Sequence, residues 1–255
     1  MDRFEILKYW DTRSKLDKSV QSTTNDFYLR VKEYRLLKKL IKELKPNSIL
    51  DLGCGDGWTT HKLACYFPKI QFWGIDFSEN MIKNAKIREK ENLTFLQQDV
   101  LSPNFSQQFD LAYTTRCLIN LTSYSDQIKA VQNIFQSIKP SGSVILIENY
   151  LLGHQNFNFM RKKFGLPEIK IRSHNLFFDE KIFLQDINNI FTIKSFKNIS
   201  STYYFLTRIV YRKFCDVTGR NTNYLGIAHR VYSYLPNLGN FGPIHALLLQ
   251  RKIDQ

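Results

Sequence analysis

A glycine-rich segment between a predicted strand and a predicted helix constrains this chain more than any other stretch. Its sequence is Ile49-Leu50-Asp51-Leu52-Gly53-Cys54-Gly55-Asp56-Gly57-Trp58. The alternate glycines allow a sharp turn and a close approach of the backbone to a ligand, because they carry no Cβ atom. A phosphate would prefer a helix N-terminus without nearby carboxylates, so Asp51 and Asp56 favour a ligand with positive charge. The same glycines would also suit an ordinary strand-to-helix turn.

Further strand ends with polar side chains follow along the chain. Asp76 ends the apolar run Phe72-Trp73-Gly74-Ile75, and its carboxylate oxygens can accept hydrogen bonds from two ribose hydroxyls. The polar residues after the later predicted strands are Asp99, Thr115 and Glu148. Such alternation of strands and helices predicts a mostly parallel sheet with helices on both faces, and ligands of these sheets bind at the carboxyl ends of the strands.

Together these spaced motifs resemble class I S-adenosylmethionine-dependent methyltransferases over roughly residues 45–150. Trp58 stands where a dinucleotide-binding loop carries its third glycine, which argues against a dinucleotide. The resemblance implies a Rossmann-like α/β fold with a mostly parallel seven-stranded sheet, helices on both faces and an antiparallel final strand. It also implies S-adenosyl-L-methionine as the cofactor, whose sulfonium and ammonium groups suit the acidic strand ends.

The resemblance implies a set of cofactor-binding residues. Asp76 would hold the ribose, Asp99 would accept the adenine amino group, and Val100 would pack on the adenine ring. Trp10 and Arg13 would form a lid near the methionine carboxylate, although a surface helix explains them equally well. Asp76 and Asp99 also have plainer interpretations, as a helix cap and a loop acid. The full expected set is Asp51, Gly53, Cys54, Gly55, Trp58, Asp76, Phe77, Met81, Asp99, Val100, Thr115, Trp10 and Arg13.

We expect one methyltransferase domain with three parts. A helical lid covers residues 1–45, a cofactor-binding core covers 46–150, and a substrate-side half covers 151–255. The aromatic-rich stretch between the last two predicted strands is too long for a tight hairpin, which predicts an inserted cap at about 203–240 with a helix near 203–217. Apolar spacing predicts the other helices at 27–44, 58–67, 79–90, 125–138 and 178–189.

The chain has a net charge of +13, and most of the basic excess lies in its C-terminal half. Such an excess suits RNA, an anionic membrane surface or a phosphorylated small substrate, and it also suits a solvated surface without a specific partner. We expect no stable nucleic acid complex, because no arginine-rich tract or RNA-binding module is visible. The sequence does not indicate the oligomeric state.

Hydropathy and cysteine spacing bear on the location of the protein and on metal or disulfide sites. No apolar stretch reaches the about 20 residues that a membrane helix needs, and the first residues lack an apolar signal core. We therefore expect no membrane span and a cytoplasmic location. The four cysteines show no paired spacing, so we expect neither a metal site nor a disulfide framework.

Transfer of a methyl group from a sulfonium mainly requires the nucleophile, methyl and sulfur to be held in line. Glu148, at the end of the fifth strand, is the expected general base for a hydroxyl acceptor. His154, expected on the following loop, is a second candidate, although a loop histidine is often a plain surface residue. Arg116 would hold an anionic substrate, or it would simply pair with a helix carboxylate. An acceptor that is already ionised needs no base.

The segment after the fourth predicted strand excludes several acceptors. Thr114-Thr115-Arg116-Cys117 lacks the Pro-Pro motif of enzymes that methylate exocyclic amines, the Pro-Cys nucleophile of cytosine-C5 enzymes and the acid cluster of catechol enzymes. Residues 115–121, 145–148 and 201–204 are similar to methyltransferases of bacterial surface polysaccharides. We therefore expect O-methylation of a small, anionic or nucleotide-linked acceptor in polysaccharide or capsule biosynthesis. An RNA methyltransferase and a non-catalytic binding protein with this fold are the alternatives.

Overall fold

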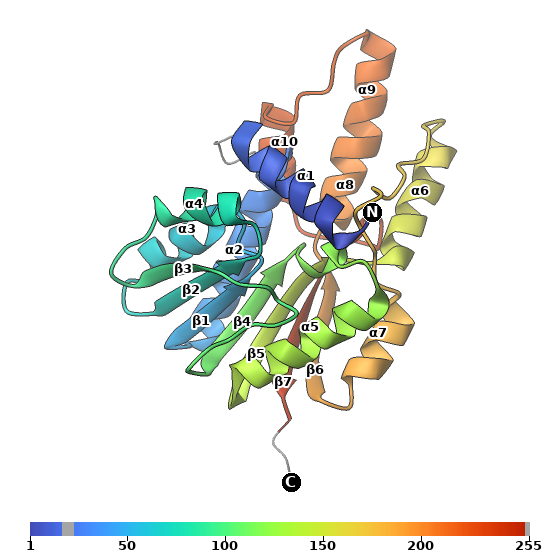
Figure 1. Cartoon of the computed structure of the whole chain (residues 1–255). Coiled ribbons are helices and arrows are strands. Elements are labelled where there is room, and N and C mark those ends of the chain that lie inside the picture. The colour runs from blue at the N-terminus through green and yellow to red at the C-terminus, as the bar shows by residue number, and fades with distance from the viewer. Residues whose placement is uncertain (17–22, 253–255) are drawn as a thin grey trace.

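The computed structural model describes residues 1–16 and 23–252, in which a seven-stranded sheet lies between two layers of helices (Figure 1). The strand order is β3-β2-β1-β4-β5-β7-β6. Strands β1 to β5 are parallel, and β7 is antiparallel to both of its neighbours. The strands are β1 (Ser48–Leu52), β2 (Gln71–Asp76), β3 (Leu93–Gln97), β4 (Phe109–Thr115), β5 (Ile138–Asn149), β6 (Phe191–Asn198) and β7 (Ile244–Arg251). The predicted Rossmann-like sheet with an antiparallel final strand is confirmed.

The helices form around this sheet where the apolar spacing predicted them, with several additions. Their bounds are α1 (Arg3–Leu16), α2 (Phe27–Leu44), α3 (Trp58–Tyr66), α4 (Glu79–Lys86), α5 (Tyr124–Ser137), α6 (Leu151–Lys163), α7 (Glu180–Ile187), α8 (Ser201–Phe205), α9 (Tyr211–Thr218) and α10 (Ile227–Tyr232), with a 3-10 turn η1 (Leu118–Asn120) and a π-helical turn η2 (Leu206–Val210). In the described ranges, no helix is both long and apolar enough to span a membrane.

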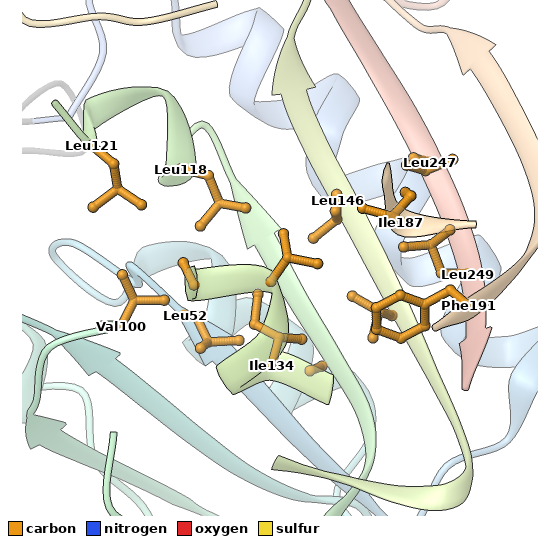
Figure 2. Packing of buried hydrophobic residues seen from close by; sticks show 14 of the residues in the cluster. Leu52, Val100, Leu118, Leu121, Ile134, Leu146, Ile187, Phe191, Leu247 and Leu249 are labelled. Carbon is orange, nitrogen blue, oxygen red and sulfur yellow. The ribbon is translucent and has the colours of Figure 1, made fainter. Parts of the chain in front are cut away.

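Two hydrophobic cores fix the sheet between its helices because strand residues alternate between the two faces. On β1, Leu50 and Leu52 belong to the core beneath α5 and α7, and Ile49 belongs to the core beneath α2 and α3. Figure 2 shows the first core, in which Leu146 of β5 and Leu249 of β7 lie with side chains of α5 and α7. The loops that follow β1 to β4 lie beyond these two cores, at the carboxyl ends of the strands.

The stretch between β6 and β7 contains a continuous helical segment, α8–η2–α9, followed by α10. α9 projects beyond the sheet, and α1 lies across the carboxyl ends of the parallel strands (Figure 1). Within this segment η2 is π-helical, a feature that is rare and is often found at functional sites. The helix expected near 203–217 is therefore present, interrupted by one π-helical turn.

One local expectation differs from the structure. The expected loop after β5 is the helix α6, so His154 lies on a helix and not on a loop. Residues 139–142 form an irregularity within the bounds of β5, since Phe109 pairs with Ile138 and Leu111 pairs with Ser143. The extra residues bulge out of the β4–β5 ladder, and the register downstream remains parallel.

Candidate functional site

A cavity of about 420 Å³ lies at the carboxyl ends of the parallel strands. Its walls come from the loops after β1 to β4, from α1, α2 and α6, and from residues 169–177. The predicted site residues that line it are Trp10, Arg13, Asp51, Gly53, Cys54, Gly55, Asp76, Phe77, Met81, Asp99, Val100, Thr115, Arg116 and His154. Trp58 and Glu148 do not line it. The fold thus gathers residues from six elements at the predicted edge of the sheet.

The glycine loop forms a tight cradle after β1. Gly53 and Gly55 have φ values of 75° and 56°, in the left-handed region that favours glycine. The N–H groups of Gly53 and Cys54 both donate to the Ile75 carbonyl, at 2.8 and 2.9 Å. A Cβ atom on Gly53 would lie 2.3 Å from the Cys117 Sγ atom. A larger residue at this position would therefore strain the backbone and displace the segment after β4.

Asp76 combines a structural and a binding position. Its carboxylate accepts hydrogen bonds from the N–H groups of Gly55 and Ser78, each at 2.9 Å. Burial raises its pKa to about 6, and the two backbone donors act in the opposite direction. Ser78, and not Asp76, caps α4 by accepting from the Met81 N–H. Asp76 therefore keeps acceptor capacity on the cavity side, where a diol would meet it.

The two acids of the glycine-rich segment have different environments. Asp51 lines the cavity and accepts from the hydroxyls of Thr60 and Tyr113, at 2.5 and 2.8 Å, and burial raises its pKa to about 7. Asp56 does not line the cavity and pairs with Arg30 of α2 at 2.5 Å. The expectation that both acids face a cationic ligand is therefore wrong for Asp56, because a buried guanidinium already neutralises it.

Helix α1 covers one side of the cavity. Arg3 forms an ion pair with Asp99, and Asp11 accepts a hydrogen bond from the Ser78 hydroxyl. Trp10 and Arg13 line the cavity from the same helix, and Arg13 donates to Asn25 at 3.0 Å. Through Arg3 and Asp11, α1 contacts the loops after β3 and β2, as the lid interpretation requires. Residues 17–22 of the predicted helical lid lie outside the described residues.

Trp58 has a structural position, in contrast to the prediction. Its ring lies edge-to-face with Phe27 and Tyr34 of α2, and the Arg30 guanidinium lies 5.0 Å from its centroid. The indole therefore packs α3 against α2, and it lies outside the cavity wall. The sequence places Trp58 correctly after the glycine loop but does not show that the first turn of α3 directs the ring toward α2.

The structure also argues against Glu148 as a base. This side chain is fully buried and accepts hydrogen bonds from the Thr114 hydroxyl at 2.7 Å and from the N–H groups of Cys117, Leu118 and Ile119 at 3.1 to 3.4 Å. Burial raises its pKa to about 7. Its oxygens hold the turn η1 in place, and no cavity surface reaches them. Glu148 is thus a positioning residue for the segment after β4.

His154 of α6 and His174 of the stretch after α6 line the part of the cavity wall that the later segments build. Asn158 holds the Ile169 backbone through two hydrogen bonds, and its amide nitrogen also donates to His154 Nε2 at 3.2 Å. Because Nε2 accepts, the neutral ring carries its proton on Nδ1. Burial lowers the pKa of both histidines. His154 therefore offers a neutral N–H donor, and His174, whose ring stacks on Tyr9, stays neutral at pH 7.

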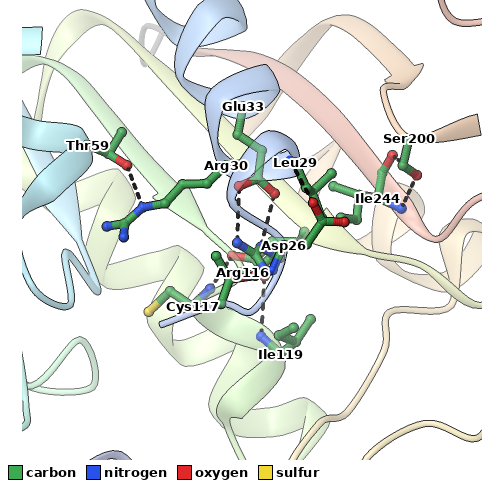
Figure 3. A network of polar contacts seen from close by, with 12 residues as sticks. Asp26, Leu29, Arg30, Glu33, Thr59, Arg116, Cys117, Ile119, Ser200 and Ile244 are labelled. Atoms are coloured by element: carbon green, nitrogen blue, oxygen red, sulfur yellow. Dashed lines mark hydrogen bonds and ion pairs between the residues drawn. The ribbon is translucent and has the colours of Figure 1, made fainter. Parts of the chain in front are cut away.

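Two ion pairs between buried carboxylates and partly buried arginines also line the cavity. Glu33 of α2 pairs with Arg116 at 3.0 Å (Figure 3), which realises the helix-carboxylate alternative for this arginine. Arg116 follows β4 with a φ of 53°, rare for a residue with a side chain. Asp26, the N-cap of α2, pairs with Arg208 of η2 at 2.5 Å and accepts from the Tyr203 hydroxyl. The first pair thus connects α2 to the segment after β4, and the second connects the start of α2 to η2.

Sequence reasoning missed the residues that complete this part of the cavity wall. Asp26 is visible as a helix cap, but its partner Arg208 lies 182 positions later and only the fold brings them together. Tyr204 and Tyr224 come from the same late segment, and Lys170 and Arg172 come from the stretch after α6. Local signals could not have found these residues, because none of them follows a strand or a glycine loop.

The chain matches known proteins in its cofactor-binding part. The methyltransferase domain family matches residues 49–142. A malonyl-[acyl-carrier protein] O-methyltransferase of Bacillus cereus is 28% identical over 130 residues, 51% of this chain and 46% of that protein. A demethylmenaquinone methyltransferase of Lactococcus lactis is 36% identical over 116 residues, 43% of this chain and 45% of that protein. The chain thus spans about half the length of the curated relatives it matches.

A solved structure extends the similarity to the whole fold. The N-methyltransferase NodS of Bradyrhizobium japonicum, in complex with S-adenosyl-L-homocysteine, covers 98% of this chain and 99% of its own with a TM-score of 0.60. Its identity to this chain is 13%, so it supports the fold alone. The glycine cradle, the acidic strand ends and the family match agree with one another. Residues 49–142 belong to the class I S-adenosylmethionine-dependent methyltransferases.

Proposed function

We propose that this protein transfers a methyl group from S-adenosyl-L-methionine to an oxygen atom of a small anionic acceptor. The observation that carries the proposal is the make-up of one cavity wall. The glycine cradle and the acidic ends of the early strands form one part of it, the first end, and basic or neutral-donor side chains, most of them from later segments, form another part, the second end. The second end contains Arg116, Lys170, Arg172, His154 and Arg208.

The residues at the first end fit the cofactor. Asp76 has free acceptor capacity for a diol, and the glycine loop leaves no side chain between the backbone and a ligand. Thr115 Oγ1 and Asn149 Oδ1 are buried, belong to cavity-lining residues and have no hydrogen-bond partner among the described residues. Such unpartnered oxygens cost free energy unless a ligand or water meets them. When bound, the cofactor supplies an electrophilic methyl group on a sulfonium leaving group.

The basic end supports an anionic acceptor. Lys170 and Arg172 are exposed at the rim of the cavity, and the described part of the chain offers them no ion-pair partner. His154 adds an N–H donor that does not depend on its protonation. These groups attract and orient an oxyanion, and long-range attraction of this kind also speeds binding. Arg116 and Arg208 border the same space but are neutralised by Glu33 and Asp26.

The acids around the cavity support an acceptor oxygen that is already ionised. Each cavity-lining carboxylate in the described residues already has a partner: Asp26, Glu33, Asp51, Asp76 and Asp99 all accept hydrogen bonds or form ion pairs. None is placed as a free base for a hydroxyl, and Glu148 lies outside the cavity. A carboxylate or phosphate oxygen needs no such base. The Bacillus cereus relative, named for O-methylation of a malonyl group, supports the carboxylate form.

The proposal keeps the expected kind of acceptor but not the expected biosynthetic role. A phosphorylated or nucleotide-linked acceptor stays within the proposed anionic class. The expected role in surface polysaccharide or capsule biosynthesis is not part of the proposal, because neither curated relative named above is described as acting on a sugar. An RNA acceptor, the alternative suggested by the net charge of +13, is tested as a separate substrate pool.

The test is transfer of label from tritiated cofactor to three pools: small carboxylic acids, a metabolite extract with and without phosphatase treatment, and total RNA. We expect label in a small anionic product. Release of the label as methanol in mild base would identify a carboxyl ester, and loss of labelling after phosphatase would identify a phosphorylated acceptor. Label in RNA alone, or no binding of S-adenosyl-L-homocysteine in calorimetry, would contradict the proposal. Asp76→Ala serves as the control with weakened cofactor binding, and its labelling should fall at a cofactor concentration below its raised dissociation constant.

A further inference from the structure

A second cavity of about 310 Å³ adjoins the first at its basic end. The two cavities share Ile169, Arg208 and Tyr224 in their walls. Residues from α6, from η2, from α9 and from the stretch after α6 enclose it. The cavity therefore continues the acceptor end of the first one, on the side away from the cofactor residues.

Arg161 of α6 is the central feature of this second cavity. It is 5% exposed, and the described residues provide no carboxylate within ion-pair distance. Its Nε atom donates to the Pro167 carbonyl at 2.7 Å and its Nη1 atom donates to the Arg208 carbonyl. Nη2 has no hydrogen bond within the described residues. A buried guanidinium without an anion is costly, so its remaining donors fit an oxyanion.

Two more arginines border this cavity, and each already has a carboxylate. Arg208 pairs with buried Asp26, whereas Arg212 pairs with Asp216 across one turn of α9, with both side chains exposed. An exposed pair of this kind contributes about 0–1 kcal/mol, so Arg212 can turn toward a ligand. Glu168 is the only acid among the described residues of the wall, and it lies exposed. The Thr222 and Tyr224 hydroxyls add neutral donors.

The π-helical turn explains how these groups come together. Thr207 Oγ1 donates to the Tyr203 carbonyl at 2.5 Å and accepts from Arg208 Nη1 at 2.8 Å. The Arg208 carbonyl turns toward Arg161, while its guanidinium turns toward Asp26 and the first cavity. Arg208 of this widened turn thus lies in the walls of both cavities. Burial and the like charges of Arg212 and Arg208 lower the pKa of Arg161, which a bound anion would relieve.

We propose that the second cavity binds an oxyacid group, phosphate or carboxylate, at the far end of the acceptor. Arg161 and Arg212 supply its charged hydrogen bonds, in the fork geometry that suits oxyanions. The acceptor would then be an elongated molecule, with its methylated oxygen in the first cavity and its anionic tail in the second. This inference rests on the proposed function for the position of the methylated oxygen.

The test measures binding of two probes, inorganic phosphate and malonate, to the full chain saturated with S-adenosyl-L-homocysteine, by calorimetry at low ionic strength. Arg212→Ala is the main variant, since it is exposed and should fold. Lys213→Ala is its control, because it removes the same charge from the next position of α9 without lining the cavity. We expect at least one probe to bind, and Arg212→Ala to weaken that binding at least fivefold while Lys213→Ala changes it less than twofold.

The two probes separate a phosphate tail from a carboxylate tail. Binding of neither probe, or equal weakening by both variants, would overturn the second site. Arg161→Met is a further test wherever circular dichroism shows that it folds, and it should abolish binding of the probe. S-adenosyl-L-homocysteine affinity is measured separately for every protein. If the wild type does not bind S-adenosyl-L-homocysteine, the proposed function is refuted. If it binds S-adenosyl-L-homocysteine but neither probe, the second site alone is refuted.

Discussion

Asp76 shows how one carboxylate joins the glycine cradle to the cofactor. Its oxygens fix Gly55 and Ser78, and its remaining acceptor capacity faces the cavity. We expect Asp76→Ala to raise the dissociation constant of S-adenosyl-L-homocysteine at least tenfold, about 1.4 kcal/mol, because the ribose loses its acceptor and the loop loses a tether. Calorimetry measures this change, and circular dichroism checks the fold. An unchanged dissociation constant would remove Asp76 from the site.

Glu148 was expected to act on the acceptor, and its contacts now predict a structural role. Replacement by Gln places an amide donor against a hydroxyl and three backbone N–H groups, of which at least one loses its acceptor. A buried donor left without a partner costs about 1–3 kcal/mol. At pH 8 we expect Glu148→Gln to lower the melting temperature by several degrees, and exposed Glu79→Gln to leave it unchanged. Reduced turnover at an unchanged melting temperature would restore a direct role.

The lid gives the first prediction at the scale of an element. Arg3 is the contact of α1 with the loop after β3, and its partner Asp99 lines the cavity. An ion pair with this exposure contributes about 0–1 kcal/mol, so we expect Arg3→Ala to weaken cofactor binding two- to fivefold. Lys8→Ala, an exposed change of the same charge on the same helix, should have no effect. Equal losses in the two variants would indicate a general electrostatic effect and not closure by α1.

α10 and β7 carry a matched pair of buried histidines. His229 is fully buried among Tyr203, Tyr211 and Tyr224, and neither ring nitrogen has a partner in the described residues. His245 is also buried, but its ring contacts the Pro243 carbonyl and Asn240. We expect His229→Phe to raise the melting temperature, because it removes an unsatisfied polar group, and His245→Phe to lower it. Thermal unfolding at pH 7.5 measures both, and destabilisation by His229→Phe would reveal a missing partner.

The elements differ in how far the sequence could reveal them. β1 to β5 and α2 to α5 follow from apolar spacing and caps, which are local signals. α6 does not, because its buried face is made of Gly153, His154, Phe157 and Arg161 and so has almost no hydrophobic periodicity. Glu148 could be placed at a strand end, but the face of the sheet toward which its side chain turns depends on the register. The cofactor end was therefore predictable, and the acceptor end, built by late segments, was not.

At the scale of the whole molecule, titrating groups of opposite tendency act on stability. Asp51 and Glu148 have raised pKa values, so their stabilising contribution is present below their unfolded pKa and is lost as pH rises through about 7. His245, with its pKa lowered to about 4, contributes stability above its unfolded pKa that is lost as pH falls through about 4. His154, His174 and His229 act in the same direction as His245. The pH dependence of overall stability therefore mixes several groups, and the pH dependence of ligand binding reports more directly on the residues of the cavity.

Cofactor binding should respond to pH in one direction. Asp76, with a pKa of about 6, and Asp51, with a pKa of about 7, both line the cavity. Hydrogen bonds from a ligand to a carboxylate favour its charged form, so binding lowers these pKa values and releases protons. We expect the affinity for S-adenosyl-L-homocysteine to fall as pH decreases from 8 to 5, most steeply below about 6.

Calorimetry in two buffers of different ionisation enthalpy measures this proton release directly, and Asp76→Asn provides the control. The variant keeps the size of the side chain but cannot ionise, so it should bind weakly at pH 8 and lose little further affinity below pH 6. Asp51 remains ionisable in the variant, which leaves a shallow dependence near pH 7. An equally steep decline in both proteins below pH 6 would assign the titration to another group, and the link between the burial of Asp76 and its hold on the cofactor would fail.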